Sequence, residues 1–114
     1  MMTEQIRIEP ADGVWVVRAA GAVIAETRAA LALVAGTAAP VIYFPPGDVA
    51  MMFLDPSPRR EDAADRGATA FYHLTAPGEH IADAGWSHPA PTGAMAALAG
   101  YVAFDAARVA VERV

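Results

Sequence analysis

Short apolar runs separated by turn residues make up most of the chain, and this pattern predicts strands. Residues 5–10 alternate apolar and polar side chains, and residues 14–19 and 22–27 are rich in Val, Ile and Trp. Asp12-Gly13 and Ala20-Gly21 separate these runs with residues typical of hairpin turns. We therefore expect two hairpins in the first third of the chain, the second with the weaker signal.

The middle of the chain is less uniform. Residues 28–36 fit either a short helix or a strand, and we favour the strand because Leu31 and Leu33 alternate with small residues. The run 41–44 is strongly β, and Pro46-Gly47 after it predicts a type II turn with a positive φ at Gly47. Residues 49–54 fit a strand or a helical turn.

The last half of the chain returns to strands. We expect residues 55–65 to form a polar loop, because they include two prolines and show no apolar periodicity. The runs 67–74 and 80–86 flank Pro77-Gly78 and predict a hairpin with Thr75 opposite His80 and His73 opposite Ala82.

The C-terminal region combines a helical turn with strands. Thr92 can cap one or two helical turns through Ala99, and residues 101–104 and 108–114 read as strands. These elements predict a single, mainly β domain spanning residues 1–114, with two antiparallel sheets and one or two short helical turns.

Composition narrows the possible functions. The chain has 114 residues, a net charge of −5 and no cysteine, so thiol chemistry and cysteine-ligated metals are excluded. The basic patch Arg59, Arg60 and Arg66 is offset by neighbouring carboxylates, which argues against nucleic-acid binding. No segment resembles a signal peptide or a membrane span, so we expect a cytoplasmic protein without membrane contact.

Three ordered blocks resemble a bacterial family of unknown function, domain-of-unknown-function family 427. They are "YFPPGDV" at 43–49, "WSHPAP" at 86–91 and "LAGYVAFDAARV" at 98–109. The resemblance implies a fold similar to the β-tent or Mss4-like group, in which two antiparallel sheets pack at an angle and leave a groove. The family has also had a nucleotidyltransferase-like label, but the chain lacks an Asp-x-Asp pair for magnesium.

The chain departs from the family pattern at one block. Where the family has Cys-Pro-Tyr-Lys-Gly, this sequence has "AADRG" at 63–67, so Arg66 replaces the lysine and only Gly67 is retained. Arginine keeps the positive charge but cannot act as a deprotonated base. The tyrosine that follows "VAF" in the family is Asp105 here, and the tyrosine of its Trp-Ser-Tyr-Pro block is His88.

Two groups of residues suggest a catalytic pair and a metal site, but both have simpler explanations. Ser87 and His88 are adjacent in an extended segment, so their side chains point to opposite faces and cannot form a nucleophile–base pair. His73 and His80 on one face of a hairpin, with Glu79 or Asp83 nearby, can reach one metal ion. A site needs at least three ligands, however, and His80 at the edge of the turn is expected to face solvent. We therefore expect no metal site and no cofactor, and the sequence identifies no catalytic residue.

The remaining candidates describe a ligand-binding groove. We expect a noncatalytic domain that binds a small polar or anionic molecule, with aromatic side chains along the groove and a guanidinium at its edge. The alternatives are an enzyme that uses Arg66, His73 and His88, and an interaction module that pairs through a strand edge, for example as a homodimer. The predicted ligand-binding residues are Tyr43, Arg66, Tyr72, His73, Trp86, His88 and Tyr101.

Overall fold

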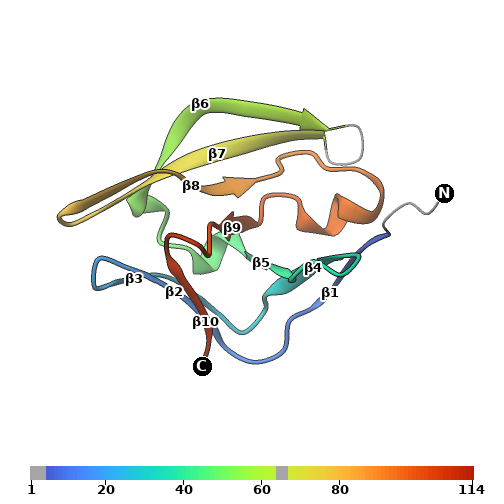
Figure 1. The fold of residues 1–114 in the computed structure, drawn as a ribbon, viewed down its shortest axis with the longest axis horizontal. Coiled ribbons are helices and arrows are strands. Elements are labelled where there is room, and N and C mark those ends of the chain that lie inside the picture. Colours follow the sequence, from blue (N-terminus) through green and yellow to red (C-terminus); the bar gives the residue numbers. More distant parts are fainter. Residues whose placement is uncertain (1–4, 64–66) are drawn as a thin grey trace.

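The computed structural model describes residues 5–63 and 67–114 and consists of two antiparallel sheets (Figure 1). The larger sheet has seven strands in the spatial order β1 (Ile6–Pro10), β4 (Leu31–Ala35), β5 (Val41–Phe44), β9 (Val102–Phe104), β8 (Glu79–Ser87), β7 (Gly67–Ala76) and β6 (Leu54–Ala63). The smaller sheet has three strands in the order β10 (Ala110–Arg113), β2 (Trp15–Ala19) and β3 (Ala22–Thr27). Short 3-10 turns complete the described part: η1 (Pro46–Asp48), η2 (Met51–Phe53) and η3 (Gly93–Leu98).

The architecture confirms the mainly β expectation with two antiparallel sheets and short helical turns. The ambiguous segment 28–36 contributes strand β4, and residues 49–54 contain the 3-10 turn η2. The hairpins at Ala20-Gly21 and at Pro77-Gly78 both form, with Ala19 paired to Ala22 and Ala76 paired to Glu79. The finer expectation, a β-tent topology, stays a prediction. Within the described ranges, no helix is long and apolar enough to cross a membrane.

The prediction of a hairpin at Asp12-Gly13 was wrong. Strand β1 pairs with β4 in the large sheet, whereas β2 pairs with β3 and β10 in the small one, so this turn takes the chain from one sheet to the other. The reason lies in packing. Ile6 and Ile8 pack against the apolar cluster around Leu33, while Val17 is buried in the separate cluster between the sheets.

The prediction of a type II turn at Pro46-Gly47 was also wrong. Gly47 is not among the glycines with a positive φ, and residues Pro46–Asp48 form a 3-10 turn. The amide of Asp48 donates to Pro45 O at 2.9 Å, and the amide of Val49 donates to Pro46 O at 3.2 Å. Two consecutive hydrogen bonds of this kind define a 3-10 turn.

The polar loop expected over residues 55–65 is, as far as the structure describes it, part of strand β6. This strand pairs with β7 and has an irregular register between Pro56 and Arg60. An edge strand faces solvent along one side, so it tolerates prolines and charged residues that would be excluded from a central strand. Edge position therefore explains why a segment without apolar periodicity adopts β structure.

The helical turn after Thr92 is confirmed, but its expected side-chain cap is not. Thr92 makes no capping hydrogen bond through its hydroxyl, and its backbone carbonyl instead accepts a bond from Met95 N at 3.1 Å. Buried Met95 and Leu98 fix the turn η3 against the sheet, so packing takes the place of the cap.

The two faces of the large sheet have different neighbours. One face packs against the small sheet and forms the main apolar core, which includes Ile24, Phe44, Leu74 and Phe104. A second, smaller cluster includes Leu33, Tyr43, Met95, Leu98 and Ala103. Because side chains alternate along a strand, neighbouring positions such as Tyr43 and Phe44 belong to different clusters.

Candidate functional site

The large sheet bends around a groove of about 630 Å³. Figure 1 shows β6 and β7 on one side of the bend and β4 and β5 on the other. Alternate residues of five segments face the groove, in keeping with the period of two along a strand. These pairs are Leu33 and Ala35, Val41 and Tyr43, Arg59 and Glu61, Thr69 and Phe71, and Trp86 and His88.

Aromatic rings form one wall of the groove. Phe71 and Trp86 are directly opposite each other in strands β7 and β8, and their ring centroids are 6.4 Å apart. The guanidinium of Arg59 lies over the Phe71 ring, 4.2 Å from its centroid. A cation over an aromatic face is attracted by the ring quadrupole, so Phe71 holds the Arg59 side chain against this wall.

A chain of hydrogen bonds runs beneath the aromatic wall. Trp86 Nε1 donates to Tyr43 Oη at 3.3 Å, and Tyr43 Oη lies 2.8 Å from His88 Nε2. His88 Nδ1 lies 3.2 Å from Thr69 Oγ1. Because the Trp86 N–H donates to the phenol, the network is satisfied when the Tyr43 hydroxyl donates to Nε2 and His88 bears its proton on Nδ1. His88 and Tyr43 are each 2% exposed, so the centre of this hydrogen-bond network is buried.

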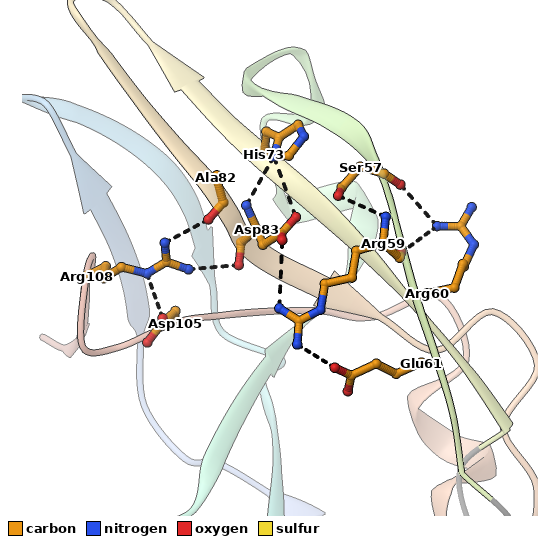
Figure 2. Close-up of polar contacts among 9 residues, drawn as sticks. All are labelled: Ser57, Arg59, Arg60, Glu61, His73, Ala82, Asp83, Asp105 and Arg108. Atoms are coloured by element: carbon orange, nitrogen blue, oxygen red, sulfur yellow. Dashed lines mark hydrogen bonds and ion pairs between the residues drawn. The ribbon is translucent and has the colours of Figure 1, made fainter.

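Arg59 also pairs with carboxylates at the groove. Its guanidinium hydrogen-bonds to Glu61 and lies 3.7 Å from Asp83 Oδ2 (Figure 2). The hydrogen bond that Arg59 donates to Glu61 is the main cause of the Arg59 pKa being raised above the usual value for arginine. The Arg59 and Glu61 side chains are each about half exposed, and exposed pairs of this kind contribute little to stability. Glu61 can therefore be displaced from Arg59 at low cost.

Asp83 lies in a bulge between β7 and β8. Tyr72 pairs with Gly85 and Leu74 pairs with Ile81, so His73 alone faces three residues of β8. The expected pairing of His73 with Ala82 alone is therefore corrected to a bulge, although Thr75 does face His80 as expected. Asp83 has a φ of +51°, a conformation that costs most residues about 1 kcal/mol but that Asp tolerates better than most.

The carboxylate of Asp83 is poorly satisfied. Its Oδ1 atom is buried and has no hydrogen-bond partner among the residues that the structure describes. His73 Nδ1 is 3.6 Å from Oδ1 and already accepts a hydrogen bond from the Asp83 amide at 3.1 Å. A buried polar atom without a partner costs about 1–3 kcal/mol, so Asp83 has unused capacity to accept a hydrogen bond.

Arg108 fixes the bulge from the other side (Figure 2). Its guanidinium donates to Ala82 O at 2.7 Å, to Asp83 O at 2.9 Å and to Asp105 Oδ2 at 2.8 Å. The hydrogen bond from Arg108, together with that from the Ala107 amide, lowers the pKa of Asp105 below its usual value. A planar guanidinium suits this arrangement because its donors diverge in a fixed fork.

The charges lining the groove nearly balance. Of the described residues, Arg59 and Arg108 are positive, and Glu61, Asp83 and Asp105 are negative. Both guanidiniums already have a carboxylate partner, whereas Asp83 keeps an acceptor without a donor. Within the described part of the chain, no group of three or more histidines and carboxylates is arranged to bind a metal ion.

A second cavity of about 520 Å³ lies between the two sheets. Trp15 of β2 and Val111 of β10 line it from the small sheet, and Ala32 and Ile42 line it from the large sheet. Glu9 and Asp105 are the charged groups of its described lining. The second cavity is therefore much more apolar than the groove.

The structure brings some of the predicted ligand-binding residues to the groove and places others elsewhere. Tyr43, Trp86 and His88 line it together. Tyr72 hydrogen-bonds to Ser87 on the opposite face at 3.3 Å, and Tyr101 packs at the edge of the Leu33 cluster.

The remaining predicted site residues are His73, which lies opposite the bulge, and Arg66. His73 contacts Asp83 from the bulge, and its ring centroid is 5.3 Å from that of His80. Arg66 lies outside the described residues. Ser87 bonds Tyr72 while His88 bonds Tyr43, so their side chains take separate partners, as expected for an extended segment.

Sequence reasoning missed the groove residues Arg59, Asp83 and Arg108. One signal was present for Asp83, because it is a carboxylate within the otherwise apolar run 81–86. The sequence pattern predicts a loop around Arg59 and places Arg108 in the last strand. Their positions in the groove depend on the register of β6 and on the turn after β9, and neither is visible in local periodicity.

Comparison with known proteins identifies the family. Residues 7–114 match the family described as domain of unknown function DUF427, and this match covers nearly all of the chain. The chain therefore belongs to this family, as the ordered sequence blocks predicted. No curated protein of known function matches the chain significantly.

Proposed function

We propose that the chain is a noncatalytic binding domain whose groove takes a small polar ligand. The observation that supports this most is Asp83, because it lines the groove from a bulge of unfavourable backbone conformation and one of its two carboxylate oxygens has no hydrogen-bond donor among the described residues. Unfavourable conformations of this kind concentrate at functional sites. The adjacent Phe71 and Trp86 rings supply apolar contact area beside the polar group, which is the usual composition of a small-molecule site.

An anionic ligand remains part of this proposal. The expected guanidinium was Arg66, and Arg59 offers the same chemistry inside the groove. A ligand carboxylate or phosphate would replace Glu61 on Arg59, and this exchange costs little because the existing pair is exposed. Arg59 would then bind the anion while Phe71 keeps the guanidinium in position.

The experiment uses the Trp86 indole N–H as a reporter in ¹H–¹⁵N spectra. Ethanolamine, acetate, inorganic phosphate and glycerol are each titrated into the labelled protein, and at least one is expected to shift this signal to saturation. Ala38→Phe fills the groove from an exposed position, whereas Ala97→Phe makes the same change at an exposed site that lines neither cavity. Loss of the shift in the first variant alone supports the proposal. A shift that survives in Ala38→Phe, or no saturable shift with any probe, overturns it.

One observation favours an enzyme as the second candidate. Tyr43 Oη and His88 Nε2 lie 2.8 Å apart and both line the groove, which is the arrangement expected of an acid–base pair. Binding ranks first because both side chains are almost fully buried and each already has partners in the network. Recovery of the bound probe chemically unchanged after long incubation supports binding, and a converted probe supports catalysis. An interaction module ranks third because the main surface feature is hollow and not a flat apolar patch.

A further inference from the structure

The groove and the second cavity share lining residues beside the short pairing of β5 and β9 in the large sheet. Strands β5 and β9 are paired only at Tyr43–Ala103 and Phe44–Val102. Beyond these pairs, the start of β5 at Val41 and the residue after β9, Asp105, have no ladder contact with each other. Val41 and Asp105 line both cavities, as do Ala39 and Trp86.

The two cavities differ in chemistry in a way that suits a two-part molecule. The groove contains five of the charged side chains described above, whereas the second cavity is lined mainly by Trp15, Ile42, Phe104, Val111 and by alanines and prolines. An apolar cavity gains free energy when it receives apolar surface from water. The second cavity is therefore suited to the hydrocarbon part of a ligand whose polar part occupies the groove.

Arg108 links Asp83 to a residue that lines both cavities. Its guanidinium donates both to Asp83 O and to the Asp105 carboxylate, and Asp105 lines the groove and the second cavity. Since one guanidinium spans these two residues, Asp83 and Asp105 are close neighbours. A ligand group bound at Asp83 therefore lies near residues that also line the second cavity.

We propose that the ligand is an amphipathic amine, with an ammonium head at Asp83 and an apolar tail that passes Trp86 into the cavity between the sheets. This inference rests on the proposed function and names its ligand class. The described groove has three carboxylates against two guanidiniums, so its charges favour a cationic head over an anionic one. Asp83 lines the groove with a side chain that is 26% exposed, so an ammonium group can approach its carboxylate from the groove.

The experiment compares n-alkylamines from ethyl to octyl, with n-alkyl carboxylates of matched length as the competing head group. The chain has two tryptophans, and both report on the site. Trp86 lines both cavities, whereas Trp15 lines only the second one. Ethylamine is expected to shift the Trp86 indole signal alone. Hexylamine and octylamine are expected to shift both, with the dissociation constant falling about fourfold for each buried CH₂.

Two variants locate the tail. Ala106 is exposed and lines only the second cavity, so Ala106→Phe is expected to remove the dependence on chain length and the Trp15 shift. Ala97→Phe is the matched control and is expected to keep both. The Trp15 and Trp86 signals are assigned beforehand with Trp15→Phe.

The outcomes separate this inference from the proposed function. If short probes bind but affinity does not rise with chain length, or if Ala106→Phe leaves the length dependence intact, the tail assignment is overturned while the groove proposal stands. If carboxylates bind more tightly than amines of the same length, the ammonium head is overturned. If no alkylamine shifts Trp86 while inorganic phosphate or glycerol does, the amine inference is overturned and the groove proposal stands. If no probe of any kind shifts Trp86, the proposed function itself fails.

Discussion

The groove contains two polar networks that differ in completeness. The network from Thr69 through His88 and Tyr43 to Trp86 is largely buried, and each of its members is hydrogen-bonded to the next. The cluster around Asp83 is charged, lies in an unfavourable bulge and leaves Oδ1 without a partner in the described structure. A complete network stabilises a fold, whereas an incomplete one costs stability and keeps capacity for a ligand. Four variants test this division.

The largest effect is expected for Tyr43→Phe. The phenol links Trp86 Nε1 to His88 Nε2. Its removal takes a hydrogen-bond partner from the buried His88 ring and from the partly buried Trp86 indole, and should lower the free energy of unfolding by about 2 kcal/mol. Urea unfolding measures this loss. Tyr72→Phe is the control, because it removes a single bond to Ser87 at 3.3 Å and should cost less than half as much. Equal losses would show that the buried hydrogen-bond network stabilises the fold no more than the single Tyr72–Ser87 bond does.

Arg108→Lys comes next. Lysine keeps the charge but cannot donate in a fixed fork to two carbonyls and Asp105, so we expect a loss of about 1 kcal/mol and faster hydrogen exchange of the amides in the bulge. Arg18→Lys alters an exposed pair with Glu112 at 3.6 Å and should change stability by only a few tenths of a kcal/mol. If exchange in the bulge is unchanged, Arg108 does not fix Asp83.

Asp83→Asn is expected to change stability in the opposite direction. Asparagine tolerates the same backbone conformation, and it removes a carboxylate whose Oδ1 atom is buried without a hydrogen-bond partner. It also gives up the 3.7 Å ion pair with Arg59, so the free energy of unfolding should rise by less than about 1 kcal/mol. The same variant should lose the amine-induced shift of Trp86. A marked loss of stability would contradict the proposed difference between the two networks, because it would show that Asp83 stabilises the fold as the Tyr43–His88 network does.

The smallest effect concerns Asp105 and pH. Arg108 lowers the pKa of Asp105 in the folded state, so its ion pair stabilises the protein above the unfolded pKa of about 4 and this contribution is lost as pH falls through the lower folded value. Asp105→Asn should therefore reduce stability at neutral pH by less than about 1 kcal/mol. The difference from the unsubstituted chain should shrink in acid. A difference that is constant with pH would show that the ion pair contributes nothing.

The sequence predicted most of the elements but few of their partners. Strand β4 and the hairpin at Pro77-Gly78 followed from alternation and turn residues, which act over a few positions. Strand β6 did not, because its backbone pairing with β7 stabilises it without apolar alternation. The exchange of partners at Asp12-Gly13 was missed for a similar reason, since it is decided by packing between distant segments.

The site was predicted only in its aromatic half. Trp86, His88 and Tyr43 could be placed by sequence blocks and by the alternation that separates Ser87 from His88. Asp83 enters the groove through a bulge with extra residues in β8, and a bulge leaves no periodic signal. Arg59 and Arg108 reach it from β6 and from the turn after β9, which lie far from Asp83 in the sequence.

The outer edge of the large sheet has a consequence for solubility at high concentration. A second molecule that tried to add a strand alongside β6 would meet Pro56 and Pro58, which have no N–H to donate, and then the charged run Arg59–Asp62. Fibre growth by continuation of the sheet is therefore obstructed at this edge. The prolines that obscured the strand in the sequence thus protect an open-edged sheet from aggregation.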